Sequence, residues 1–151
     1  MSETVFITGF PGFIASRLVH ELARTPAKFV LLVQPAFAER ARAEVQEIAA
    51  ETGSSVDDFA LLSGDITSPN LGLGIEELAK ARAETTILFH LAAIYDLAVA
   101  REPAMRINLG GTQNVNDFAR SVPTLRHYHY VSTCYVARKR RGVILETELE
   151  H

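Results

Sequence analysis

Short hydrophobic runs alternate with longer amphipathic segments along almost the whole chain. Runs rich in β-branched and aromatic residues, which predict strands, cover residues 4–8, 29–33, 59–62, 85–90 and about 127–133. Every position of the run 29–33 is apolar, which is typical of a strand buried on both faces of a parallel sheet. The segments between the runs have the three- and four-residue spacing of apolar positions that is typical of helices packed on a sheet.

One helix is predicted after each of the first four strands. The first begins after Gly12 and ends near Thr25 and Pro26, and the fourth begins near Pro103. The residues expected to face the sheet are Ile14, Ala15, Leu18, Val19 and Leu22, then Ala38, Ala41, Val45 and Ile48, then Ile75, Leu78 and Ala79, and finally Met105, Leu109, Val115 and Phe118. This alternation requires parallel strands with right-handed crossovers, so the predicted fold is an α/β doubly wound parallel sheet of the Rossmann type with about five strands.

A glycine-containing turn joins the first strand to the first helix. The strand stops at Thr8, and Gly9, Gly12 and Ala15 follow with the spacing Gly-x-x-Gly-x-x-Ala. Such a turn aims the unpaired N–H groups and the positive end of a helix at the carboxyl end of the strand, where phosphate binds. The second glycine lets a pyrophosphate approach the main chain, although two glycines also suit a turn for steric reasons alone.

Composition and charge narrow the class of protein. The 151 residues fit one domain, and a net charge of -3 gives no reason to expect nucleic acid or an anionic membrane surface as a partner. Cys134 is the single cysteine, which excludes an internal disulfide framework and suits the cytoplasm. The sequence contains no apolar run long enough to cross a membrane, no room for a signal peptide before the first strand, and no metal-binding pattern.

Six motifs lie at or near the carboxyl ends of the predicted strands or on the fourth helix. They are the segments 8–15 (TGFPGFIA), 64–67 (GDIT), 71–74 (LGLG), 90–93 (HLAA), 108–112 (NLGGT) and 131–136 (VSTCYV). Their order and spacing resemble the extended short-chain dehydrogenase/reductase superfamily. Within it, the chain is most similar to the fatty acyl-CoA reductase and thioester-reductase-like group, which has a male-sterility-type NAD-binding domain.

The resemblance implies a nicotinamide dinucleotide site. The glycine turn would hold the pyrophosphate, Asp65 and Ile66 would contact the adenine, and Ala92 and Ala93 would pass beneath the ribose and nicotinamide. The cofactor-binding residues expected on this basis are Thr8, Gly9, Pro11, Gly12, Phe13, Ile14, Gln34, Asp65, Ile66, Leu91, Ala92 and Ala93. Taken alone, Asp65 also suits the cap of a turn.

The resemblance also implies catalytic positions. Thr133 aligns with the hydroxyl residue that orients the substrate carbonyl, and Asn108 with a residue of structural and proton-relay function. From the residues alone, Thr133 also suits a strand, and Asn108 also suits a solvated helix position or a bond to nearby backbone. His90 is expected to be a hydrogen-bonded histidine at a strand end and not a catalytic group.

The tyrosine and lysine of these reductases, spaced Tyr-x-x-x-Lys on a helix, have one match in the sequence. Tyr135 and Lys139 have that spacing, but Tyr135 lies inside the strand-to-loop motif, and the basic residues that follow show no helical apolar stripe. We therefore predict that this pair is not catalytic and that the basic run is a solvated loop. The functional pair is expected after residue 151, so residues 1–151 are predicted to be a dinucleotide-binding domain that stops before that helix and the substrate-binding part. The fifth strand would then be an exposed apolar edge.

The position that selects between NAD and NADP favours NADP. An acidic residue at the end of the second strand would bond the ribose 2′-hydroxyl of NAD, but Gln34 occupies this end. Arg40 or Arg42 lies close enough in sequence to meet a 2′-phosphate, although both equally suit solvated helix positions. We therefore expect NADP, with NAD as the alternative, in a reductase of a small-molecule thioester, aldehyde or ketone that can form a homo-oligomer. The alternatives are a sugar-nucleotide epimerase or dehydratase and a non-catalytic dinucleotide-binding module.

Overall fold

The structure is a computed structural model that describes residues 3–96, 98–133, 140–145 and 147. Strands and helices alternate, as the hydrophobic pattern predicts. The elements, in chain order, are β1 (Glu3–Thr8), α1 (Phe13–Leu22), β2 (Ala27–Val33), η1 (Pro35–Phe37), α2 (Ala38–Thr52), η2 (Val56–Asp58), β3 (Phe59–Ser63), η3 (Pro69–Gly72), α3 (Ile75–Glu84), β4 (Ile87–His90), α4 (Arg101–Ala104), the π-helical segment η4 (Met105–Gly111), α5 (Thr112–Arg120) and β5 (His127–Tyr130).

The five strands form one parallel sheet in the order β3-β2-β1-β4-β5. β1 pairs with β2 on one side and with β4 on the other, so that Thr8 lies between Leu32 and His90. β2 and β3 lie on one side of β1, whereas β4 and β5 lie on the other. The strand order therefore reverses between β1 and β4, and this is the point at which ligands bind in such sheets. This topology confirms the predicted doubly wound Rossmann-type sheet.

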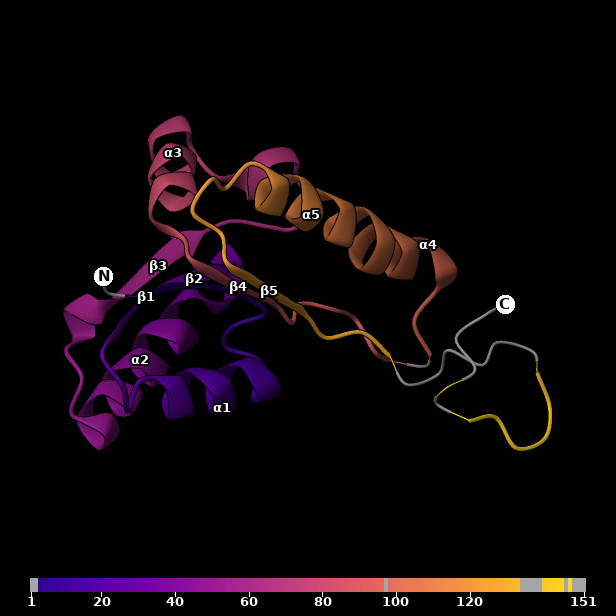
Figure 1. The fold of residues 1–151 in the computed structure, drawn as a ribbon, viewed down its shortest axis with the longest axis horizontal. Coiled ribbons are helices and arrows are strands. Elements are labelled where there is room, and N and C mark those ends of the chain that lie inside the picture. Colours follow the sequence, from indigo (N-terminus) through magenta and orange to yellow (C-terminus); the bar gives the residue numbers. More distant parts are fainter. Residues whose placement is uncertain (1–2, 97, 134–139, 146, 148–151) are drawn as a thin grey trace.

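Helices cover both faces of the sheet (Figure 1). α1 and α2 pack on one face, around a core that includes Phe29 stacked on Phe59 with ring centroids 4.9 Å apart. α3 and α5 pack on the other, where Phe6 of β1 lies 4.7 Å from the ring of Phe118. The residues 29–33 of β2 are all buried, which confirms the prediction from the apolar run.

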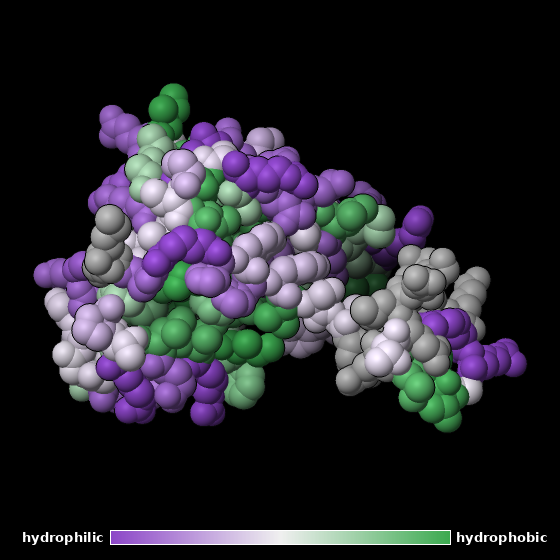
Figure 2. Space-filling model, in the orientation of Figure 1, coloured by the Kyte–Doolittle hydropathy of each residue, from purple (hydrophilic) through white to green (hydrophobic). Residues whose placement is uncertain are grey.

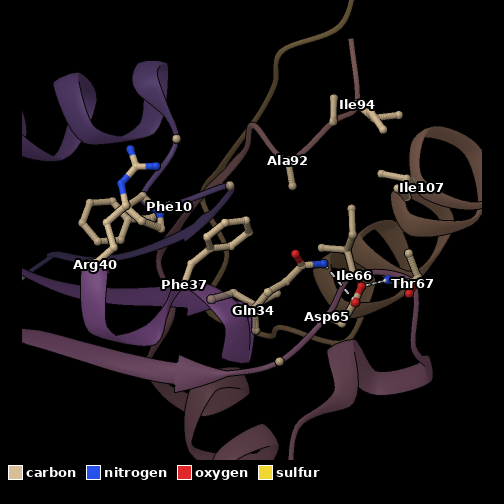
Figure 3. Close-up of a pocket in the computed structure, with 16 residues that line it drawn as sticks. Phe10, Gln34, Phe37, Arg40, Asp65, Ile66, Thr67, Ala92, Ile94 and Ile107 are labelled. Atoms are coloured by element: carbon tan, nitrogen blue, oxygen red, sulfur yellow. Dashed lines mark hydrogen bonds between the residues drawn. The ribbon is translucent and has the colours of Figure 1, made fainter. Parts of the chain in front are cut away.

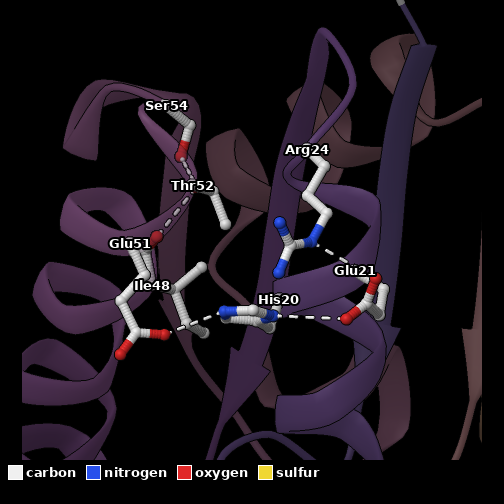
Figure 4. Close-up of polar contacts among 7 residues, drawn as sticks. All are labelled: His20, Glu21, Arg24, Ile48, Glu51, Thr52 and Ser54. Carbon is white, nitrogen blue, oxygen red and sulfur yellow. Dashed lines mark hydrogen bonds and ion pairs between the residues drawn. The ribbon is translucent and has the colours of Figure 1, made fainter.

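Polar contacts on the outer surface join α1 to α2 (Figure 4). His20 Nε2 lies 2.9 Å from Glu51 Oε2, and Arg24 Nε lies 3.3 Å from Glu21 of the same helix. At the end of α2, the Thr52 hydroxyl donates to the Ile48 carbonyl oxygen over 2.8 Å. These contacts fix the surface of this helical layer, whereas its attachment to the sheet comes from the apolar core.

Parts of the predicted apolar stripes are exposed. In α1 the buried residues are Ala15 and Val19, whereas Ile14 is 57% exposed. Met105 and Leu109 are also exposed, in the part of the α4–α5 rod that extends past the sheet (Figure 1). The prediction was wrong for these residues because periodicity shows which helix face is apolar, but not how far the sheet beneath it reaches. Ile75, the first residue of α3, is also exposed, and Ala79 is exposed because it lies on the face of α3 opposite the buried residues Leu78 and Ala81.

The last two strands are shorter than predicted. β4 begins at Ile87 instead of residue 85, because the Thr85 hydroxyl donates to Ala81 and closes the end of α3. β5 ends at Tyr130, three residues before the predicted end. All four of its residues are exposed histidines and tyrosines, so the expectation of an apolar edge strand was wrong.

The surface of the protein carries both hydrophobic and hydrophilic side chains. Hydrophobic side chains gather between the regions of β5 and α1 on the face shown in Figure 2, with hydrophilic helix surfaces above and below them. Across the part of the chain that the structure describes, no helix has the length and apolar content that a membrane crossing requires.

Candidate functional site

The turn between β1 and α1 brings the carboxyl ends of β1 and β4 into contact. Gly9 has a φ of 92°, in the left-handed region, and a Cβ at this position would lie 2.8 Å from Ala92 N and 2.9 Å from Leu91 C. The Gly12 N–H donates to the Gly9 carbonyl oxygen over 2.7 Å and closes the turn. Any side chain at Gly9 would therefore both strain the backbone and push away the main chain of Leu91 and Ala92, directly after β4.

Gly12 is required by the geometry of the turn itself. A Cβ at Gly12 would lie 2.5 Å from the Gly9 carbonyl oxygen. Gly12 is also the N-cap of α1, with no side-chain hydrogen bond to the first turn, so the first N–H groups of α1 remain available to an anion. The structure thus supplies the cradle that a pyrophosphate needs, and the steric explanation for the two glycines holds at the same time.

A pocket of about 380 Å³ opens beside this turn, at the carboxyl edge of the sheet (Figure 3). Eight of the twelve residues predicted to bind the cofactor line it, namely Gly9, Pro11, Gly12, Gln34, Asp65, Ile66, Ala92 and Ala93. These residues come from the ends of all four strands β1 to β4. The topology therefore gathers at one place the residues that the sequence motifs singled out separately.

The other four predicted residues do not line the pocket. Thr8 is buried, and Leu91 packs against the core on the α1 side. Phe13 and Ile14 are 73% and 57% exposed on the first turn of α1, with the Arg17 guanidinium 5.3 Å from the Phe13 ring. Their side-chain contacts with a cofactor stay predictions.

Further residues complete the pocket. Phe10, Phe37 and Arg40 lie on one side of it, whereas Ile94 and Ile107 lie on the other (Figure 3). Arg40 was one of two arginines considered from the sequence, and Gly64 and Thr67 lie within a quoted motif. Phe10 likewise lies within the motif at 8–15. The sequence patterns did not identify Leu32, Phe37, Ile94 and Ile107 as pocket residues. For Ile94 and Ile107 no sequence pattern would have done so, because the packing of η4 against the segment after β4 brings them there.

Asp65 has two hydrogen-bonded partners in the pocket wall. Its Oδ1 accepts the Thr67 N–H over 2.7 Å, and its Oδ2 accepts the Gln34 side-chain amide over 3.0 Å (Figure 3). Asp65 thus caps a turn, as the simpler interpretation expects, and still faces the pocket. Each carboxyl oxygen can accept a second donor, so a ligand amine can bond to Asp65 without displacing either partner.

His90 is buried between two threonines beneath the pocket. The Thr8 hydroxyl oxygen accepts the N–H groups of Leu91 and Ala92, so its proton goes to His90 Nδ1, 2.8 Å away. The remaining ring N–H, on Nε2, then donates to the Thr112 hydroxyl over 3.0 Å. Burial lowers the pKa of His90 to about 4, so the ring is neutral at pH 7. Both ring nitrogens are occupied, as a non-catalytic histidine requires.

Asn108 holds the segment that follows β4. Its side-chain oxygen accepts the Ile94 N–H over 2.9 Å, and its side-chain amide donates to the Ile94 carbonyl oxygen over 2.8 Å. Asn108 lies in the π-helical segment η4, an irregularity that often marks functional sites. The two bonds position Ile94 in the pocket wall, and a function of Asn108 in proton transfer remains a prediction.

Ile66 is held in the pocket wall by the helix behind it. The Asn114 side chain donates to the Ile66 carbonyl oxygen over 2.7 Å. A Cβ on Gly111 would lie 2.6 Å from Ile66 Cδ1, whereas a Cβ on the neighbouring Gly110 would meet nothing within 4 Å. The absence of a side chain at Gly111 therefore sets how closely the helix approaches Ile66.

This difference predicts opposite effects for two neighbouring substitutions. Gly111→Ala is expected to lower the free energy of unfolding by about 1–3 kcal/mol, because the added methyl group must displace Ile66. Gly110→Ala, the matched control, is expected to leave stability unchanged or raise it by up to about 1 kcal/mol through helix propensity. Urea unfolding of both variants checks this, and equal stabilities would contradict the packing explanation.

The other predicted catalytic residue, Thr133, does not line the pocket. Thr133 is exposed and follows the end of β5 by three residues. Tyr135 and Lys139, which we predict not to form a catalytic pair, lie outside the described residues. Within the described part of the chain, no group of three or more His, Cys, Asp or Glu side chains is arranged to hold a metal ion.

Comparison with characterised sequences agrees with this geometry. Fatty acyl-CoA reductase 1 of Arabidopsis thaliana is 29% identical over 96% of this chain and 34% of its own length. The alcohol-forming fatty acyl-CoA reductase of Simmondsia chinensis is 26% identical over 96% of this chain and 33% of its own length. The chain thus spans about a third of the length of these relatives.

Solved structures show the same fold. The reductase domain of a non-ribosomal peptide synthetase from Mycobacterium tuberculosis superimposes with a TM-score of 0.74 at 23% identity, over 91% of this chain and 34% of that one. The terminal reductase domain of the myxalamid biosynthetic pathway gives 0.71 at 26% identity, over 87% and 35%. The family described as Male sterility protein, which is defined by an NAD-binding domain, matches residues 7–150. The resemblance drawn from the motifs is therefore confirmed, and the chain belongs to the male sterility protein family.

Proposed function

We propose that this chain binds NADP, in preference to NAD, as the cofactor domain of a reductase that acts on an acyl thioester. The observation that carries the proposal is the pocket where the Gly9–Gly12 turn, the N-terminus of α1 and Asp65 meet. The relatives are named as acyl-CoA reductases, which supports a thioester in preference to the sugar nucleotide of the alternative interpretation. A non-catalytic dinucleotide-binding module is the other alternative. Binding experiments alone would not distinguish it from a reductase, because both bind the cofactor.

The pocket fits an extended dinucleotide. The N–H groups of the first turn of α1 would hold the pyrophosphate, and Asp65 would accept the exocyclic amine of the adenine. Ala92 and Ala93 at the end of β4 leave room for the ribose and nicotinamide end. Reduced cofactor bound there would supply a hydride to the substrate carbonyl carbon.

The residues Asn108 and Thr133 are proposed to act at that carbonyl. Asn108 fixes the main chain of Ile94, which borders the end of the pocket away from Arg40 (Figure 3). The Thr133 hydroxyl is a donor of the type that orients a carbonyl oxygen. Hydride addition to a thioester carbonyl would form a tetrahedral alkoxide, which becomes an aldehyde when the C–S bond breaks and the thiolate leaves. The departing thiolate takes a proton from a donor that we place outside the described residues.

The two arginines of α2 differ in their access to the pocket. Arg40 lines the pocket, whereas Arg42 does not and pairs with Glu39. Arg40 has a more distant carboxylate, with its Nε 4.0 Å from Glu44 Oε2. Gln34 adds no negative charge that would repel a phosphate. These observations favour Arg40 as the group that meets a 2′-phosphate.

The cofactor preference is tested with a pair of variants of these arginines. Arg40→Gln is expected to weaken NADPH binding about tenfold and leave NADH binding unchanged, because only NADPH carries the charge that Arg40 meets. Arg42→Gln, the matched control, is expected to change neither affinity. Calorimetric titration of the three proteins at moderate salt measures both constants. Tighter binding of NADH than of NADPH by the unmodified chain would contradict the NADP preference.

A further inference from the structure

A left-handed turn lies directly behind Asp65 and does not itself line the pocket. Asn70, Leu71 and Gly72 have φ values of 54°, 60° and 68°, so three consecutive residues lie in the left-handed region. Two of them carry side chains, and Leu71 is fully buried. Residues other than glycine adopt this conformation rarely, and they keep it only where the surrounding structure enforces it.

The turn and Ser68, which precedes it, are bonded to the main chain of Asp65. The Asp65 N–H donates to the Leu71 carbonyl oxygen over 2.8 Å, and the Ser68 N–H donates to the Asp65 carbonyl oxygen over 3.0 Å. The Leu71 N–H in turn donates to Ser68 over 3.1 Å. The Asp65 N–H is thus bonded to the turn directly, and its carbonyl oxygen is bonded to Ser68, which accepts the Leu71 N–H. The position of the Asp65 main chain therefore depends on the turn conformation.

Close packing makes this connection rigid. A Cβ on Gly64 would lie 2.4 Å from the Leu71 carbonyl oxygen, and a Cβ on Gly72 would lie 3.3 Å from Asp65 N. Leu71 is anchored in the core beneath α3 and α5. Residues 64–67 line the pocket and the turn does not, so the turn supports the pocket wall from behind.

We propose that the left-handed turn 70–72 is a positioning device that aims the Asp65 carboxyl group at the exocyclic amine of the cofactor's adenine. The proposal rests on the proposed function, since it presumes that Asp65 meets an adenine. Leu71 and Gly72 belong to the motif at 71–74 but do not line the pocket. The proposal assigns them a function in positioning Asp65. The turn fixes the main chain of Asp65, and the bonds from Thr67 and Gln34 fix its carboxyl group, so a displaced turn shifts the acceptor away from the amine.

The test compares NADPH with its hypoxanthine analogue, in which a carbonyl oxygen replaces the exocyclic amine. The unmodified chain is expected to bind NADPH on the order of tenfold more tightly, as one hydrogen bond to a charged group allows. Gly72→Ala is expected to reduce this ratio to near one, as is Asp65→Ala. Gly53→Ala is the matched control, because Gly53 also has a positive φ, of 76°, but its Cβ would meet nothing within 4 Å.

A second variant covers the case in which Gly72→Ala fails to fold. Asn70 is exposed, so Asn70→Val strains the turn without disturbing the core, and it is expected to lower the ratio as well. If these variants lose thermal stability but keep the tenfold ratio, the turn has only a structural function and the proposal is overturned. Equal binding of both dinucleotides by the unmodified chain would also overturn it, while the proposed function stands. If the unmodified chain binds neither dinucleotide, both this proposal and the proposed function are overturned.

Discussion

Replacing Gly12 by valine is expected to abolish dinucleotide binding, with a loss of at least about 100-fold in affinity. A Cβ at this position would lie 2.5 Å from the Gly9 carbonyl oxygen, so the turn must open before the side chain fits. The opened turn no longer presents the first N–H groups of α1 to the pyrophosphate, and the valine side chain occupies the space that the phosphates would need. Calorimetric titration with NADPH measures the affinity.

Gly74 provides a matched control for this substitution. Gly12 and Gly74 are both N-caps of ten-residue helices, and both have an extended backbone, with ψ values of 158° and 161°. A Cβ on Gly74 would meet only the end of the Glu77 side chain, at 3.4 Å. Gly74→Val is therefore expected to bind NADPH like the unmodified chain, and similar losses in both variants would contradict a specific function of Gly12.

Acidification is expected to destabilise the protein through His90. Burial lowers the pKa of His90 to about 4 in the folded state, from an ordinary value of 6.5. Between these values the unfolded chain binds the proton and the folded chain does not, so stability falls as pH falls. The contribution of His90 is complete above pH 6.5 and is lost progressively toward pH 4, by about 3 kcal/mol in total.

Urea unfolding at several pH values between 4 and 8 measures this effect. His90→Gln is expected to be less stable at pH 7.5, where the bonds to Thr8 and Thr112 are disturbed, and to have a flatter pH profile. The bonds to Arg126 and to Lys28 lower the pKa of Glu3 and of Asp58, respectively. The stability that these two carboxylates contribute is therefore lost at lower pH, when they are protonated. An unchanged profile in His90→Gln would show that His90 is not the group responsible.

The sequence by itself determined the order of the elements and therefore the class of fold. The fully apolar run 29–33 predicted a doubly covered strand, and all five residues are buried. Such features are local, because a run of apolar residues or a glycine-rich turn carries its structural consequence within a few positions. The glycine turn and the residues at the ends of the strands could therefore be identified in advance, and eight of them line one pocket.

Only the tertiary structure decided how far each element extends and what faces the pocket. Ile14, Met105 and Leu109 match an apolar stripe, but the structure leaves them exposed. The bond between Gln34 and Asp65 joins residues that are 31 positions apart, and it exists only because β2 and β3 are neighbours in the sheet. Leu71 adopts a left-handed conformation that its residue type disfavours. Each of these depends on contacts between distant segments, and periodicity within one segment contains no information about such contacts.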